Sequence, residues 1–197
     1  MPSAALLTWR SERARRLDRL QFAHATVGGT GPGRRYLTEE LNHALILRLA
    51  AEFQGFARDL HDEAAARLAA TLSARVAERE RALLSLLTTT RRLDRGNANP
   101  SVLMHDFGLF GLELWAELQQ RFPVRAGRWR QRLALLNDAR NGLAHADSRR
   151  IELVAAAGWP LTLASARRWR RSLDALAAGM DRATGEHLGR VFGARTW

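Results

Sequence analysis

The chain of 197 residues is 46% hydrophobic, enough for one domain with a sizeable core, and carries a formal net charge of +11. All 31 of its basic residues are arginine, and it has no cysteine, which excludes disulfides, thiolate metal sites and a cysteine nucleophile. So large a positive charge attracts polyanions and favours nucleic acid, or an acidic protein, as partner.

Metal sites and membrane segments are not expected from this sequence. No two of its six histidines lie three or four residues apart and none belongs to an HExxH pattern, so we expect no metal and no other cofactor. The apolar run at residues 4–7 is too short for the core of a signal peptide, and no later stretch approaches the length of a transmembrane helix. We therefore expect a soluble, cytoplasmic protein.

The N-terminal part has the pattern of a helix followed by a linker. Residues 3–27 place leucines among arginines, which predicts a helix with a basic outer face. The glycine run at residues 28–33 lacks the Gly-Lys-Ser/Thr ending of a phosphate-binding loop, so we interpret it as a linker. We divide the chain into an N-terminal basic helix with a Gly-rich linker, residues 1–36, and a helical domain, residues 37–197.

The helical domain repeats apolar residues at steps of three and four. Thr38 is a candidate N-cap, and residues 41–60 are expected to form a central buried helix. Residues 61–90 predict a further helix, either separate or continuous with the central one. A loop is expected at residues 94–100, followed by an apolar and aromatic helical segment at residues 101–122.

Pro123 separates that segment from the last third of the chain. Residues 133–147 repeat apolar side chains at helical spacing, and residues 162–191 predict a last helix with a cluster of arginines. Residues 150–155 are the one candidate for extended structure. Because no strand-and-turn rhythm appears elsewhere, the sequence predicts an all-α fold: a bundle of four or five core helices with an N-terminal helical extension.

The stretch at residues 133–147 predicts an amphipathic helical passage with its polar residues along the side opposite the apolar ones: Asn137, Arg140, Asn141 and His145. Arg140, Asn141 and His145 supply a fixed cation, an amide and an imidazole, groups suited to binding and cleaving a phosphodiester. The Arg-to-His spacing alone has little weight, because 31 arginines and six histidines in 197 residues produce it about once by chance. It occurs three times, but only here does Asn follow the Arg. The competing interpretation is a solvated helix face on which these residues coincide.

The extended pattern, Arg-Asn-x-x-x-His after a leucine-rich helix, resembles the signature of the HEPN superfamily. Its members are compact helical domains found in prokaryotic ribonucleases of toxin–antitoxin and phage-defence loci. The order of elements is similar over about residues 37–180. Glu52, in the run Ala-Glu-Phe-x-x-Phe, resembles an acidic residue that faces the Arg/His pair in many HEPN proteins; an ordinary ion pair with Arg48 is the alternative. Asp147 stands where toxins modified by a partner nucleotidyltransferase carry Tyr, which argues against that mode of control.

The resemblance implies a metal-independent endoribonuclease in which the ribose 2′-OH attacks the adjacent phosphate. His145 would transfer protons, Arg140 would stabilise the charge on the phosphoryl oxygens, and Asn141 would orient the substrate. Residues five positions apart on one helix lie about 140° apart around its axis. Arg140 and His145 can therefore both reach one phosphate only through the length of the Arg140 side chain or with a second subunit. The resemblance implies the second solution, a homodimer in which two such helices face each other.

The expected partners are RNA, a second copy of the chain and a cognate antitoxin or defence-system protein. No association with a membrane is expected. Two other classes of function fit the same residues. One is a non-catalytic HEPN-like module that binds RNA or a partner protein, and the other is a helical regulator or antitoxin whose basic surface binds an acidic partner. Aromatic residues of the segment at 101–122 are available for a dimer interface or for the core: Phe107, Phe110 and Trp115.

Overall fold

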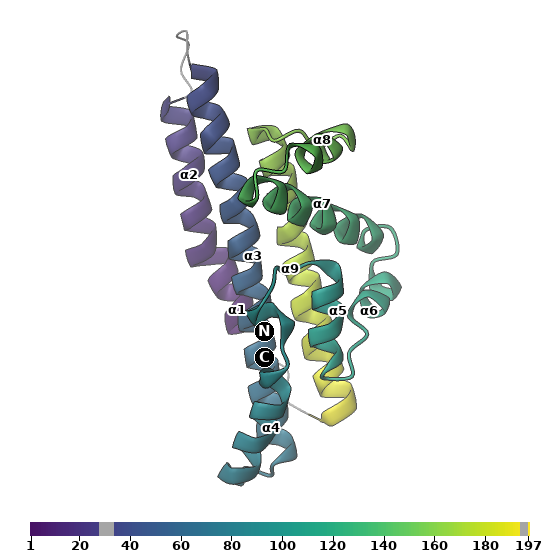
Figure 1. The fold of residues 1–197 in the computed structure, drawn as a ribbon. Coiled ribbons are helices and arrows are strands. Elements are labelled where there is room, and N and C mark those ends of the chain that lie inside the picture. The colour runs from purple at the N-terminus through teal and green to yellow at the C-terminus, as the bar shows by residue number, and fades with distance from the viewer. Residues whose placement is uncertain (28–33, 194–196) are drawn as a thin grey trace.

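The computed structural model describes the backbone of residues 1–27, 34–193 and 197, and among these the side chains of all but residues 34–37. The predicted Gly-rich linker at residues 28–33 lies outside the described residues. The described chain is helical without strands, which confirms the all-α prediction (Figure 1). Its helices are Ala4–Thr8 (α1), Ala14–Val27 (α2), Arg34–Leu72 (α3), Ala77–Thr89 (α4), Pro100–Gly108 (α5), Leu114–Arg121 (α6), Ala126–Ala144 (α7), Ser148–Ala156 (α8) and Leu163–Phe192 (α9), with a π-helical turn at Trp9–Arg13 and a 3-10 turn at Arg92–Asp94.

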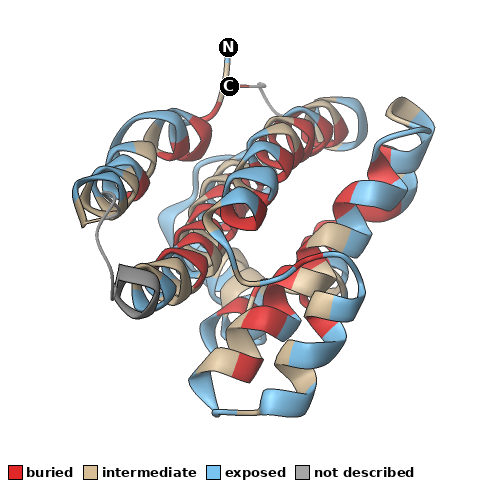
Figure 2. Ribbon diagram, turned by 90° about the horizontal axis from the view of Figure 1, so that it is seen from above, coloured by how far each residue is buried: buried red, intermediate tan, exposed pale blue. Residues whose placement is uncertain are grey.

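The bundle is built around two long helices, α3 and α9, which make the most extensive packing in the molecule. α3 has 39 residues and extends well beyond the predicted central helix at residues 41–60. Its N-terminal half packs against α2, and α7 packs against both α3 and α9 (Figure 1). Seen from above, the buried residues of these helices face one another across a common interior (Figure 2). None of the described helices combines the length and apolar character that a membrane span requires.

The N-terminal segment contributes to this same core. α1, the π-helical turn and α2 follow one another without a break, and the Trp9 side chain is buried against two α3 residues, Phe53 and Phe56, at centroid distances of 5.9 and 5.7 Å. The indole Nε1 of Trp9 donates to Asp174 Oδ1 of α9 at 3.0 Å. Because burial of an indole stabilises a small domain substantially, the predicted extension is held firmly on the bundle.

One local prediction was wrong, and another segment is divided more finely than its pattern indicated. Residues 150–155, proposed as extended, lie in α8, because Asp147 Oδ1 caps its first turn by accepting from Arg150 N at 3.0 Å. Val154 is buried on the face that α8 turns toward α7. The segment at 101–122 forms two helices, α5 and α6, separated at Gly111, whose φ of 72° is a left-handed conformation that glycine adopts without steric cost.

A glycine in the middle of α3 makes room for an ion pair that joins the N-terminal segment to the bundle. Arg13 Nη1 donates to Glu52 Oε2 at 2.8 Å, and Arg13 Nη2 donates to Asp59 Oδ2 at 2.6 Å. The guanidinium lies directly over Gly55, where an added Cβ would approach Arg13 Nη1 to 2.3 Å. Glycine is unfavourable inside a helix, so close approach of Arg13 is a physical reason for its presence here.

Gly55→Ala is therefore expected to destabilise the protein by about 1–2 kcal/mol, although Gly→Ala in an unobstructed helix is usually stabilising. The measurement is the free energy of unfolding in urea. Gly127→Ala in α7 is the matched control, because an added Cβ there meets nothing within 4 Å, and it should be neutral or stabilising. In an Arg13→Gln background the cost of Gly55→Ala should disappear. A Gly55→Ala protein at least as stable as wild type would refute the steric argument.

Candidate functional site

The predicted motif lies at the end of α7 and in the turn that follows. α7 ends at Ala144, His145 is its C-cap, and Ala146 adopts a left-handed φ of 51° before α8 begins. The two helices approach closely at Gly142, where an added Cβ would lie 2.9 Å from the Ile151 side chain. The small residue within the motif is thus required by the packing of α8 on α7, and it fixes the turn that carries His145.

The polar side predicted for this helix is partly buried in α7. Asn137 is buried, and its Nδ2 donates to the carbonyl oxygens of Ala98 at 3.2 Å and Leu133 at 2.9 Å. Arg140, four residues after the buried Leu136, is half-buried. The prediction that this polar side faces away from the core was therefore wrong at Asn137, which connects α7 to the loop before α5 and lines the same cleft as Asn141.

Arg140 and Asn141 form a short hydrogen-bonded chain with that loop. Asn141 Oδ1 accepts from Arg140 Nη1 at 3.1 Å and from Asn97 Nδ2 at 2.8 Å. Asn141 also lines a cleft of about 610 Å³ between α5 and α7, together with Asn99 and Arg130. Within the described residues no carboxylate pairs with Arg140. Its guanidinium is therefore oriented by an amide while its charge remains without an acidic partner.

His145 is exposed, and in the described part of the chain its imidazole has no hydrogen-bond partner. No hydrogen bond joins it to Arg140, as expected from their separation around the helix axis. Arg140 and Asn141 are thus brought together, whereas His145 lies apart from Arg140 within one chain.

Glu52 is paired with other arginines. Its buried carboxylate contacts Arg13 at 2.8 Å, Arg48 at 2.6 Å and Arg16 at 3.4 Å. Burial raises the pKa of Glu52, but Arg13 and Arg48 outweigh burial and hold that pKa below its ordinary value. The expected ion pair with Arg48 is present. Among the described contacts of Glu52 none reaches Arg140 or His145, so the proximity of Glu52 to these two residues stays a prediction from the resemblance.

The aromatic residues proposed for a dimer interface belong to the core. The exposed fractions of Phe107, Phe110 and Trp115 are 0%, 2% and 8%. They pack within the bundle, and Trp115 Nε1 donates to the Pro100 carbonyl at 2.9 Å. A homodimer therefore has no support from these side chains, and its case depends on the separation of Arg140 from His145.

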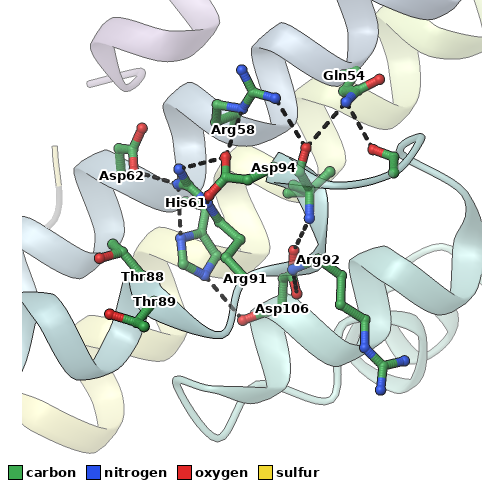
Figure 3. Close-up of polar contacts among 12 residues, drawn as sticks. Gln54, Arg58, His61, Asp62, Thr88, Thr89, Arg91, Arg92, Asp94 and Asp106 are labelled. Atoms are coloured by element: carbon green, nitrogen blue, oxygen red, sulfur yellow. Dashed lines mark hydrogen bonds and ion pairs between the residues drawn. The ribbon is translucent and has the colours of Figure 1, made fainter.

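A buried polar network, which the sequence did not indicate, orders the loop that carries Asn97 (Figure 3). Asp106 is fully buried, and its carboxylate accepts from the backbone N–H groups of Arg92 and Leu93 at 2.9 and 2.8 Å. Gln54 of α3 donates to the carbonyl oxygens of Leu93 and Gly96 at 3.1 and 2.7 Å. Each contact satisfies a backbone group of the loop between α4 and α5, so the position of Asn97 is fixed from both sides.

His61 lies at the centre of this network and is kept neutral. Its Nε2 contacts the Asp106 carbonyl oxygen at 3.1 Å, and its Nδ1 faces Arg91 Nη1 at 3.5 Å. Arg91 in turn pairs with Asp62 and Asp94. Burial, reinforced by the positive charge of Arg91, lowers the pKa of His61 to about 4 although the two aspartates Asp106 and Asp62 act in the opposite direction.

No protein-family model, curated protein or solved structure matches the chain. Across the described residues no three His, Asp or Glu side chains are grouped to hold a metal ion.

The lowered pKa of His61 predicts a loss of stability in mild acid. His61 binds a proton near pH 6.5 in the unfolded chain but only near pH 4 in the folded chain. The free energy of unfolding therefore has its full value above pH 6.5 and falls by about 3 kcal/mol as the pH drops toward 4. Thermal unfolding between pH 7 and pH 4 measures this slope. His61→Gln keeps a donor and an acceptor but cannot titrate, so it should flatten the slope even if it is less stable at pH 7. Equal slopes in the two proteins would contradict the assignment.

Proposed function

We propose that the protein is a metal-independent endoribonuclease that acts as a homodimer, with Arg140 and His145 as its catalytic residues. The observation that carries this proposal is the arrangement at the end of α7. An arginine without a carboxylate partner is oriented through Asn141 and Asn97, and an exposed histidine follows at the end of the same helix. The resemblance to HEPN ribonucleases and the net charge of +11 support the same reading.

In the proposed reaction the ribose 2′-oxygen attacks the adjacent phosphorus while the bond from phosphorus to the 5′-oxygen breaks. His145 accepts the proton of the 2′-OH, and a proton is returned to the leaving 5′-oxygen. Arg140 donates hydrogen bonds to the non-bridging oxygens, where negative charge accumulates. The products are a 2′,3′-cyclic phosphate and a 5′-hydroxyl end. Asn141 orients Arg140 and faces the cleft between α5 and α7, which is open to substrate.

A second subunit brings the two catalytic groups together. Arg140 is half-buried and bonded to Asn141, whereas the exposed His145 lies about 140° away around the helix axis, so one phosphate is reached most directly by Arg140 of one chain and His145 of the other. On this proposal the protein is a toxin or defence effector with an antitoxin or defence-system partner.

A non-catalytic module that binds RNA or a partner protein is the second candidate. The absence of a contact between Arg140 and His145 within the described chain favours it, since a binding site needs no such alignment. The two candidates differ in what His145 does. A catalytic His145 is required for cleavage, whereas in a binding module it is one contact among many.

Arg140→Ala and His145→Ala should each reduce RNA cleavage by about 100-fold or more, because each removes a group that acts in the transition state. The assay follows a mixed RNA pool in EDTA, with detection of new 5′-hydroxyl ends. Fold is checked by circular dichroism, and RNA affinity should survive His145→Ala.

Arg19→Ala and His24→Ala are the matched controls, because this pair on α2 has the same spacing without the Asn and should leave cleavage unchanged. The pair Arg182 and His187 is unsuitable, since His187 is buried and hydrogen-bonded to the Phe110 carbonyl. Cleavage that persists in His145→Ala at the wild-type rate would reject the nuclease. RNA binding with no cleavage by the wild type would establish the binding module.

A further inference from the structure

A groove between α7 and α9 is lined by five guanidinium groups and no carboxylate. Its volume is about 400 Å³, and Trp129, Ser172 and Ala175 form the rest of its lining. The arginines come from two helices that are far apart in the sequence and side by side in the fold (Figure 1). They are Arg125, Arg128 and Arg132 of the α7 segment and Arg168 and Arg171 of α9.

Acidic side chains do not neutralise this charge. Ion pairs occur throughout the described chain, but none involves these five arginines. Like charges gathered in one groove repel one another, more strongly where the helices exclude part of the solvent. The arrangement is therefore destabilising for the isolated chain and becomes favourable when an anion occupies the groove.

Some of the guanidinium groups are held in place before any ligand arrives. Arg168 lies over the Trp159 ring at 4.0 Å from its centroid and donates to the Gly158 carbonyl at 3.2 Å. Arg132 lies over the same ring at 5.7 Å, and that ring stacks on Trp169 at 4.8 Å. Cation–π contacts of this kind orient a guanidinium without neutralising it, so its donors remain available to an anion.

The shape of the groove suits a chain of phosphates better than a single anion. On α7 the arginines follow a spacing of three and four residues, which places them along one helix face over about 10 Å. Trp129 lines the groove but is only 5% exposed, and the neighbouring Trp159 is buried under Arg168, so the groove offers little aromatic surface on which a base could stack. The available contacts can bind the phosphodiester backbone of a nucleic acid but do not distinguish its bases.

We propose that the α7–α9 groove binds the phosphodiester backbone of the RNA substrate. This inference rests on the proposed function, since it names how that substrate is held. His145 follows Arg132 by 13 residues, about 20 Å along α7, so the groove is separate from the cutting residues and acts by anchoring RNA at a distance. It provides affinity without sequence preference, and any choice of cleavage position is left to the end of α7.

The test is RNA binding as a function of salt, in a His145→Ala background that does not cut. A fluorescein-labelled single-stranded RNA is titrated with protein between about 50 and 200 mM salt. Arg128→Gln/Arg171→Gln removes two groove charges that take no part in the stacking on Trp159. If each contacts a phosphate, the slope of log affinity against log salt should fall by about 1.4, and affinity at 0.1 M salt should fall about 20-fold.

Arg79→Gln/Arg81→Gln on α4 is the matched control. This variant removes the same charge from exposed positions on α4, which packs beside the C-terminal end of α3 (Figure 1). Its slope of log affinity against log salt should stay within about 0.3 of that of the His145→Ala protein. Equal effects of the two double variants would overturn the groove as a site and leave the nuclease proposal standing. Groove-dependent RNA binding by a wild-type protein that cuts no RNA would uphold the groove and reject the nuclease. If the groove arginines are needed to bind a poly-glutamate peptide and the protein binds no RNA, the ligand of the groove is an acidic protein and the RNA proposal is overturned.

Discussion

Two ionisable side chains are buried on the same long helix, α3, and the arrangement of the other elements follows from the need to partner them. Glu52 and His61 are 3% and 0% exposed. A buried carboxylate without a cation would cost several kcal/mol, and a buried imidazole without hydrogen bonds would cost somewhat less. Arg13 supplies the cation for Glu52 and thereby joins the N-terminal segment to α3. Arg91 and Asp106 supply the partners for His61 and thereby order the chain between α4 and α5.

The second of these partnerships extends to the candidate site. The loop that Asp106 and Gln54 fix carries Asn97, Asn97 donates to Asn141, and Asn141 accepts from Arg140. A series of hydrogen bonds therefore connects the middle of α3 to the guanidinium proposed to act on the phosphate. Such pre-orientation matters for catalysis because an electrostatic contact that is already in place does not have to be reorganised when charge develops. His145 lies outside this series, in a turn whose geometry depends on Gly142.

The sequence predicted the helical architecture well where apolar residues repeat at three and four, as in α3 and α9. It failed where local pattern and tertiary contact disagree. The stretch at residues 150–155 was proposed as extended and contains the β-branched residues Ile151 and Val154, yet it is helical and packs over Gly142. Asn137 reads as a surface residue, but it is buried because a neighbouring loop offers a carbonyl oxygen.

The candidate site was predictable only in part, for the same reason. Arg140, Asn141 and His145 stand together in the sequence, so their motif is visible there. Arg13 and Arg16, which pair with Glu52, lie more than 30 positions from it in the sequence, and the partners of His61 and the α9 side of the arginine groove are similarly distant. The spacing of Arg125, Arg128 and Arg132 on one helix face was a usable signal for the groove, but their two partners on α9 were not foreseeable without the fold. HEPN membership remains a prediction.

The central claim is that Arg140 of one chain and His145 of another act on the same phosphate, and mixing two inactive proteins tests it most directly. Arg140→Ala and His145→Ala are purified separately, combined after reversible dissociation, and assayed for RNA cleavage in EDTA. Half of the dimers then contain one of each chain, and one of their two sites keeps both catalytic residues, so activity should return to about one quarter of wild type. If the mixed sample stays as inactive as its components although mass spectrometry shows that mixed dimers have formed, the shared site is wrong.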